Sequence, residues 1–180
     1  MWHVKSCTDR TSPFWSVVLR ATAMAGLIGL TVAMAGPARA DPGERATLRF
    51  DARYILESVA RQMNVTLRPD EPVPVIHFES TTPLAQFQEA VVAQWRFRPP
   101  LFANVYVVAR NEIYLTDDPR YYRRLRRTLD ESLAHEFAHY IQTRYFGANL
   151  ADETCEVEAV AVQFAFTEFN RMTGAPGDAG

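Results

Sequence analysis

The sequence predicts a small α+β domain in which helices surround a short, largely antiparallel sheet. Apolar residues recur at helical spacing in several segments, which lie at 53–64, 82–95, 129–146 and about 152–172. Stretches rich in β-branched and aromatic residues stand between these segments, at 73–78, 104–109 and 112–116. The chain has 180 residues, and the part expected to fold is long enough for one domain and too short for two.

The first forty residues (1–40) are expected to be a secretory signal peptide. Three basic residues precede an apolar run from Ala21 to Gly36, and an Ala-Arg-Ala sequence at 38–40 provides a cleavage site of the small-x-small type. An uncleaved membrane anchor is the alternative, but the apolar run has sixteen residues where a spanning helix needs roughly 20. We therefore expect a periplasmic or secreted protein whose mature chain begins at Asp41.

The charge of the mature chain argues against nucleic acid as a partner. Four of the 19 basic residues and one of the 21 acidic residues lie within the first forty positions, so the mature chain carries a net charge of −5. The folded domain is expected over 41–172. Residues 173–180 are rich in Gly, Ala and Pro and are expected to form a disordered tail.

The elements of the first half are predicted from local spacing and from proline. Ile55 and Val59 lie on one face of the helix over 53–64. Prolines open the β-rich segment 73–78, and Pro83 suits the first turn of the helix that follows it. A hairpin comes next, because 104–109 and 112–116 alternate β-branched and aromatic residues around the turn signal Arg110-Asn111.

The segment 129–146 is predicted to be an amphipathic helix. Its apolar residues fall on one face, and they are Leu129, Leu133, Ala134, Phe137, Tyr140 and Ile141. Asp130 or Ser132 can cap its start, and Gly147 suits a left-handed end. The opposite face carries the sequence His-Glu-x-x-His.

This H-E-x-x-H sequence predicts a metal site. At 3.6 residues per turn, His135 and His139 stand about 40° apart on one helix face, where both can bind one metal ion. Glu136 lies roughly 100° around the helix, where it can take a proton from a water in the metal's open position. The simpler interpretation is a chance combination of polar residues on a solvated helix, which the amphipathic pattern around it disfavours.

The third metal ligand is expected downstream. The extended pattern of other zinc enzymes requires Gly at 142 and His at 145, where this chain has Gln142 and Tyr145. No histidine follows His139, so a third ligand from downstream must be a carboxylate or Cys155. Cys155 offers a softer thiolate, but a cysteine beside harder carboxylate ligands is more often a small buried residue.

Three glutamates near the start of the last helix are candidates, in the order Glu156, Glu158 and Glu153. Glu156 is favoured because it shares a polar helical stripe with three further residues, which are Gln163, Thr167 and Asn170. Glu158 points about 200° away from Glu156, so only one of the two can face the metal. Glutamates near a helix N-terminus also interact favourably with the helix dipole, which explains the cluster of three without a metal. It does not explain why the cluster follows an H-E-x-x-H sequence.

The sequences HEFAHYIQ and EVEAVAVQ, at 135–142 and 156–163, resemble the glutamate-type zincins. More narrowly, the chain is similar to a group of small, uncharacterised secreted bacterial zincin-like proteins. The resemblance implies a zincin-like fold and a zinc-dependent peptidase site, with ligands His135, His139 and Glu156 and the base Glu136. It departs from the family at Val160, where many glutamate zincins carry an Asp that orients a histidine, so another residue must do this here.

Two functions follow from the resemblance. The first is a zinc metallopeptidase that cleaves peptide bonds with a zinc-bound water activated by Glu136. The alternative is a catalytically inactive zincin-like binding module of the cell envelope. In zincins a sheet edge above the site takes up substrate in extended form, and the segment 112–116 is the candidate for that edge here.

Two other features have simpler interpretations. His77 lies between apolar residues of a strand and is interpreted as a core or edge histidine rather than a ligand. The arginine run, defined as Arg120, Arg123, Arg124, Arg126 and Arg127, is interpreted as a solvated face. Contact with anionic lipid headgroups is its alternative function, with Tyr121 and Tyr122 at the interface.

Overall fold

The computed structural model describes residues 44–173, so the predicted signal peptide and all but the first residue of the predicted tail lie outside it. The helices are α1 (Ala52–Gln62), α2 (Leu84–Trp95), α3 (Pro119–Leu125), α4 (Leu129–Phe146) and α5 (Glu153–Thr173). The strands are β1 (Val75–Phe78), β2 (Val105–Val107) and β3 (Glu112–Leu115), and a short 3-10 turn η1 (Glu79–Thr81) follows β1. Among the helices of 44–173, none has the length and apolar composition that crossing a membrane requires.

The α+β class is confirmed, but the sheet is mixed rather than largely antiparallel. Its strand order is β1-β3-β2. The predicted hairpin is confirmed, because β2 pairs antiparallel with β3, whereas β1 pairs parallel with β3. The candidate edge at 112–116 was therefore wrong: β3 is the central strand, with both of its edges already paired.

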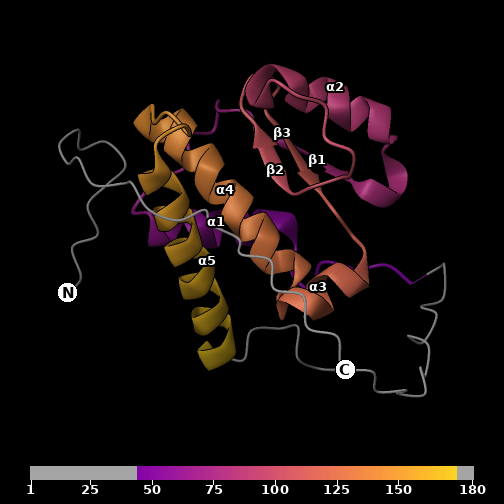
Figure 1. Ribbon diagram of the computed structural model, residues 1–180. Coiled ribbons are helices and arrows are strands. Elements are labelled where there is room, and N and C mark those ends of the chain that lie inside the picture. The colour runs from indigo at the N-terminus through magenta and orange to yellow at the C-terminus, as the bar shows by residue number, and fades with distance from the viewer. Residues whose placement is uncertain (1–43, 174–180) are drawn as a thin grey trace, which may run out of the picture.

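Helices cover both faces of this sheet. Alternate residues of the strands point to opposite faces. On one face Val105, Val107 and Tyr114 pack against Phe87 of α2. On the other face the core residues include Tyr106 and Ile113, packed with α1, α4 and α5. Figure 1 shows α2 on one side of the sheet and α4 crossing on the other, between the sheet and α5.

Helix α4 has the predicted bounds, and all six residues of its predicted apolar face are buried. Its predicted N-cap was wrong. Thr128 caps the helix in a capping box with Glu131, while the buried Asp130 accepts hydrogen bonds from the backbone N–H groups of Arg49 and Phe50. Gly147 ends the helix at φ 64°, a left-handed conformation that glycine adopts without strain.

Helix α3 was not predicted, because the arginine run dominates its sequence. Pro119 stands at its first position and Asp118 caps it, which is sufficient to start a single short helix. All five arginines are exposed, as the solvated interpretation requires. Tyr122 is buried and donates a hydrogen bond of 2.6 Å to the carbonyl of Thr116, so it is not an interfacial side chain.

The capping box predicts a measurable contribution to stability. Replacing Thr128 by Ala should lower the free energy of unfolding by about 1 kcal/mol, because the N–H of Glu131 loses its acceptor. Thr128→Ser keeps the hydroxyl and should stay close to wild type. Urea unfolding of the three proteins measures the difference, and equal stability of the Ala and Ser variants would contradict this role of the cap.

Candidate metal centre

The structure brings together the three residues predicted as ligands. His135 and His139 project from α4, and Glu156 projects from the first turn of α5. One ligand atom from each lies within 4.8 Å of the others. The two histidine side chains are 14% and 12% exposed and Glu156 is 62% exposed, so the group opens to solvent on its carboxylate side.

Close packing of α4 on α5 sets this arrangement. Ala138 on α4 and Cys155 and Ala159 on α5 are fully buried, and small side chains at such positions let two helices approach closely. The loop after Gly147 returns the chain so that α5 begins beside the histidine-bearing turns of α4 (Figure 1).

The distances among the donor atoms fit one metal ion. His135 Nε2 and His139 Nε2 are 3.1 Å apart, and the Glu156 carboxylate lies 3.4 Å from the first and 3.3 Å from the second. Bonds of about 2.0–2.1 Å in a tetrahedral site place neighbouring ligand atoms roughly 3.3 Å apart. Three such separations form one face of the tetrahedron and leave the fourth position open on the solvent side.

Gln142 holds the ring of His139 in the form that a metal requires. Its amide nitrogen donates to the carbonyl of Cys155 at 2.8 Å and to the carboxylate of Glu158 at 2.9 Å. The amide oxygen is thereby turned toward His139 Nδ1, which lies 2.8 Å away and donates to it. The other nitrogen, Nε2, remains available as the ligand atom.

Sequence reasoning missed this role of Gln142. Position 142 was used only to exclude the extended pattern that requires glycine there. A residue three positions after His139 lies on the same side of the helix, where its side chain can reach the histidine ring. The orienting group absent at Val160 is thus supplied from α4 itself. His135 has no such partner among the described residues, since its Nδ1 is buried without a hydrogen bond.

The other candidate ligands lie elsewhere. Glu158 is partly buried and accepts a hydrogen bond from Gln142, so it is connected to His139 only through Gln142. Glu153 is exposed and Cys155 is fully buried, and neither belongs to the metal-ligand group. His77 stacks on Tyr114 in the sheet, as its core interpretation expects.

The surroundings shift the pKa of each candidate ligand differently. Burial lowers the pKa of His135 to about 4, and the neighbouring His139 adds to this effect. Burial also acts to lower the pKa of His139, but its hydrogen bond with Glu156 and the charge of Glu136 outweigh burial, and the net pKa is raised. The hydrogen bond with His139 lowers the pKa of Glu156. A metal ion at this group would compete with protons for both histidines.

Glu136 is the least solvated acid near the group. Its side chain is buried, and burial raises its pKa to about 7, against the opposing effects of His139 and of a backbone hydrogen bond from Tyr106. A carboxyl group that changes charge near neutral pH suits proton transfer at that pH. The hydrogen bond also places Glu136 directly beside strand β2.

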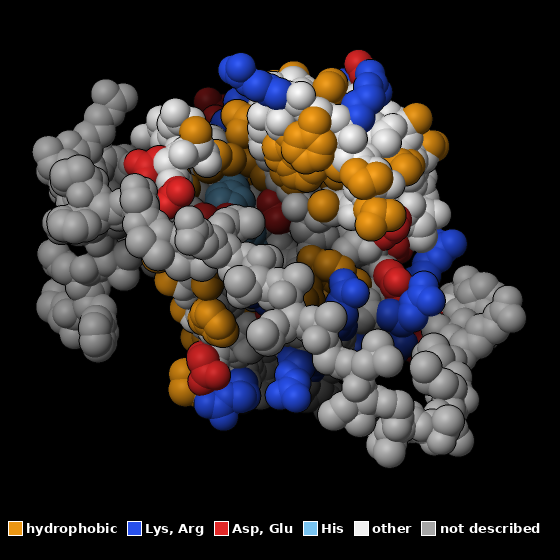
Figure 2. Space-filling view, viewed as in Figure 1, with side chains coloured by type: hydrophobic (Ala, Val, Ile, Leu, Met, Phe, Trp, Pro, Cys, Tyr) orange, Lys and Arg blue, Asp and Glu red, His pale blue; other side chains and the backbone are white. Residues whose placement is uncertain are grey.

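A hollow runs over α4 at this position. Figure 2 shows histidine side chains at its base, between the side of the molecule formed by α5 and the side formed by α2 and the sheet. A separate cavity of about 570 Å³ is lined by Thr143, one turn after His139 on α4, and by none of the three residues of the metal-ligand group. Most of its walls are apolar, and they include Trp95, Val108 and Leu150.

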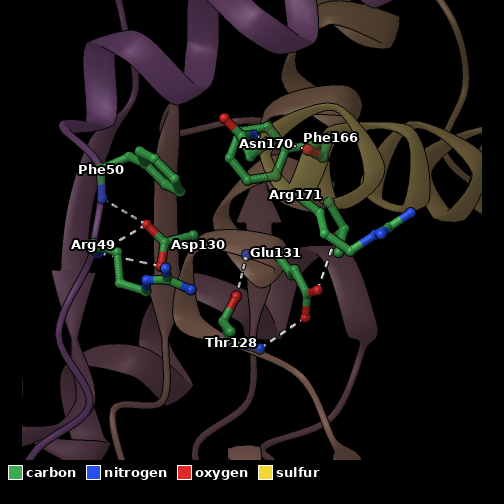
Figure 3. A pocket seen from close by; sticks show the side chains of 9 residues that line it. Arg49, Phe50, Thr128, Asp130, Glu131, Phe166, Asn170 and Arg171 are labelled. Atoms are coloured by element: carbon green, nitrogen blue, oxygen red, sulfur yellow. Dashed lines mark hydrogen bonds between the residues drawn. The ribbon is translucent and has the colours of Figure 1, made fainter. Parts of the chain in front are cut away.

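A second cavity, of about 310 Å³, lies at the other end of α4 (Figure 3). Thr167 and Asn170 line it, with Asp130 and Glu131 from the start of α4. Thr167 donates a hydrogen bond of 2.8 Å to Glu131. Two residues of the polar stripe of α5, Thr167 and Asn170, therefore lie at this second cavity, and of that stripe only Glu156 belongs to the metal-ligand group.

No protein-family model, curated protein or solved structure matches this sequence. The geometry of the site and the chemistry of its side chains therefore carry the functional argument. Both centre on the turn of α4 that bears His135 and His139.

The different positions of Glu156 and Glu158 predict different effects of their removal. Glu156→Ala should weaken zinc binding by at least about a hundredfold, because one of three ligands is lost. Glu158→Ala should weaken it by less than about tenfold, since it removes only a partner of Gln142. Competition with a fluorescent zinc chelator measures both affinities. A larger loss in the Glu158 variant would transfer the ligand role to Glu158.

The hydrogen bond between Gln142 and His139 predicts an effect on the same affinity. Gln142→Ala should weaken zinc binding by about 10- to 100-fold, because the ring of His139 loses the acceptor that orients it. Gln163→Ala is the matched control, as it removes another buried glutamine that is bonded to neither histidine. Equal affinities of the two variants, with native circular dichroism, would show that the ring needs no orienting partner.

Proposed function

We propose that this protein is a zinc-dependent metallopeptidase, with His135, His139 and Glu156 as ligands. The observation that carries the proposal is the triangle of donor atoms with sides of 3.1, 3.4 and 3.3 Å, beside the buried carboxyl group of Glu136. Two histidines and a glutamate with a fourth open position are typical of catalytic rather than structural zinc sites.

Each described residue has a defined task in this reaction. Zinc in such a site supplies a Lewis acid that polarises the scissile carbonyl and makes its bound water acidic. Glu136 accepts the proton of the attacking water and passes it to the nitrogen of the leaving amine. The backbone N–H of Tyr106 holds the Glu136 carboxylate in place. Gln142 keeps the Nε2 atom of His139 directed at the ligand position.

The substrate is expected to lie along β2 rather than along 112–116. Strand β2 is an edge strand, and its residue Tyr106 contacts the proposed base Glu136. An extended peptide added to this edge would lie beside the turn of α4 that bears Glu136. The zincin-like fold and the periplasmic or secreted location belong to this same proposal.

The features of Glu136 favour catalysis over an inactive binding module. Burying a carboxyl group costs free energy unless hydrogen bonds or a charged partner offset that cost. Glu136 is buried beside the proposed ligands, and its pKa lies near the pH at which a base must act. A module that only binds a partner has no use for this arrangement.

Chelation tests the proposed function. The purified mature protein should hydrolyse members of a quenched fluorescent peptide library. It should lose this activity with a chelator and regain it when about one equivalent of zinc is restored. Activity that survives chelation, with zinc removal verified, would refute the zinc mechanism.

A further inference from the structure

The segment that leaves the end of α2 presents apolar and basic side chains to solvent together. Residues 96–101 have the sequence Arg-Phe-Arg-Pro-Pro-Leu and are called the 96–101 loop. Phe97 is 56% exposed and Leu101 is 75% exposed. Arg96 and Arg98, on either side of Phe97, are exposed as well. Single exposed apolar residues are common on protein surfaces, but two large ones in one short loop with arginines between them form an amphipathic surface.

Packing on α2 holds the loop in this exposed position. Trp95 and Phe102 flank the loop, and the rings of both contact the ring of Phe87 on α2, with centroids 5.9 and 4.3 Å apart. In the middle of the loop, the carbonyl of Pro99 accepts a hydrogen bond of 2.8 Å from the side chain of Gln88. Two consecutive prolines further restrict the backbone. The loop is therefore attached at both ends and at its middle, and its own apolar side chains stay outside the aromatic cluster beneath it.

The charge around the loop is mainly positive. Arg98 pairs with Glu89 of α2 at 2.8 Å, and Arg110 donates a hydrogen bond of 3.3 Å to the carbonyl of the same glutamate. Glu89 is the one acidic residue in the sequence of 84–104, so the three arginines outnumber it. Figure 2 shows apolar side chains gathered over the side of the molecule formed by α2 and the sheet, with basic side chains at the border of this area.

We propose that the 96–101 loop inserts its two apolar side chains into the headgroup region of an anionic lipid bilayer, while its two arginines bind lipid phosphates. Apolar side chains enter this region together with neighbouring basic groups that remain at the headgroups. A protein partner that covered Phe97 would also have to bury the arginines on either side of it, which costs free energy unless each is paired. A bilayer surface takes up both kinds of side chain at once. The inference is independent of the proposed function, because no residue of the metal-ligand group takes part.

Tryptophan fluorescence with lipid vesicles tests the proposal. Trp95 is the only tryptophan of the mature chain, and its ring stacks on that of Phe97 with centroids 5.8 Å apart. Vesicles of phosphatidylethanolamine with phosphatidylglycerol should shift the emission of the mature protein to shorter wavelength, whereas vesicles of phosphatidylcholine alone should not. Raising the salt concentration should weaken binding to the anionic vesicles, because salt screens the arginines.

Variants of the loop separate the two contributions, with co-sedimentation as a readout that does not depend on Trp95. Phe97→Ser combined with Leu101→Ser should weaken binding to the anionic vesicles by at least about tenfold, because the apolar side chains no longer enter the bilayer. Leu101→Ser alone should weaken it by a smaller factor, and it serves as a second test if the double change disturbs the loop. Arg96→Gln combined with Arg98→Gln should weaken binding by roughly fivefold for each arginine.

Two controls change matching residues elsewhere on the surface. Phe164→Ser removes an aromatic ring that is 60% exposed on α5, which α4 separates from the sheet. Arg123→Gln combined with Arg124→Gln removes two exposed charges of the arginine run. Both controls should bind like the wild type, and circular dichroism verifies that every variant is folded. The proposal is overturned if the wild type does not bind anionic vesicles, if folded loop variants bind like the wild type, or if the arginine-run control loses binding as much as they do.

Discussion

Glu136→Gln should keep zinc and the native fold while lowering kcat for peptide hydrolysis by at least about 10²- to 10⁴-fold. The amide has nearly the same shape as the carboxyl group but cannot accept a proton from water at neutral pH. Metal analysis measures the zinc content, and circular dichroism reports whether the native fold is kept. Single-turnover hydrolysis of a peptide found by library screening measures the loss of activity.

The control for this variant is Glu153→Gln, which changes an exposed glutamate outside the metal-ligand group. It should retain wild-type kcat. If Glu136→Gln hydrolyses the peptide as fast as the control, Glu136 is not the base. If the zinc-loaded wild type cleaves no peptide and binds its partners with the same affinity as the variant, the proposed catalytic function is wrong.

His139→Ala should abolish stoichiometric zinc binding. The loss of one of three protein ligands removes about a third of a binding free energy that is roughly 10 kcal/mol or more in well-formed sites. This corresponds to at least about a hundredfold weaker binding. Isothermal titration with zinc, at a pH where the remaining histidine is neutral, measures the change.

His77→Ala is the matched histidine control. His77 stacks on Tyr114 in the sheet, with ring centroids 4.8 Å apart, and does not belong to the metal-ligand group. The variant should bind one zinc ion with wild-type affinity even if its stability falls. Loss of zinc from His77→Ala, with retention by His139→Ala, would place the metal site in the sheet instead of on α4.

Local signals in the sequence were sufficient to predict α4 and its candidate ligands. Helical spacing and Gly147 predicted both ends of α4, and the H-E-x-x-H spacing placed two histidines on one face. Glu156 followed from the stripe it shares on α5, although two other residues of that stripe, Thr167 and Asn170, line a different cavity. These features depend on residues within a few turns of one another, where periodicity carries the information.

Long-range contacts could not be predicted in the same way. The parallel pairing of β1 with β3 puts β3 at the centre of the sheet, and no local pattern in 112–116 distinguishes a central strand from an edge strand. The hydrogen bonds of Gln142 to Cys155 and Glu158 exist only because α5 packs on α4. The hydrogen bonds of the Gln94 side chain likewise depend on how α2 lies on the sheet.

X-ray absorption spectroscopy at the zinc edge tests the central claim most directly. The mature protein, loaded with one equivalent of zinc, should show a first shell of nitrogen and oxygen atoms at about 2.0–2.1 Å, including two imidazoles and no sulfur. Glu156→Ala should change this shell, and Glu153→Ala should not. A first shell with sulfur at about 2.3 Å, or zinc that remains hydrated only by water, would contradict a site built from His135, His139 and Glu156.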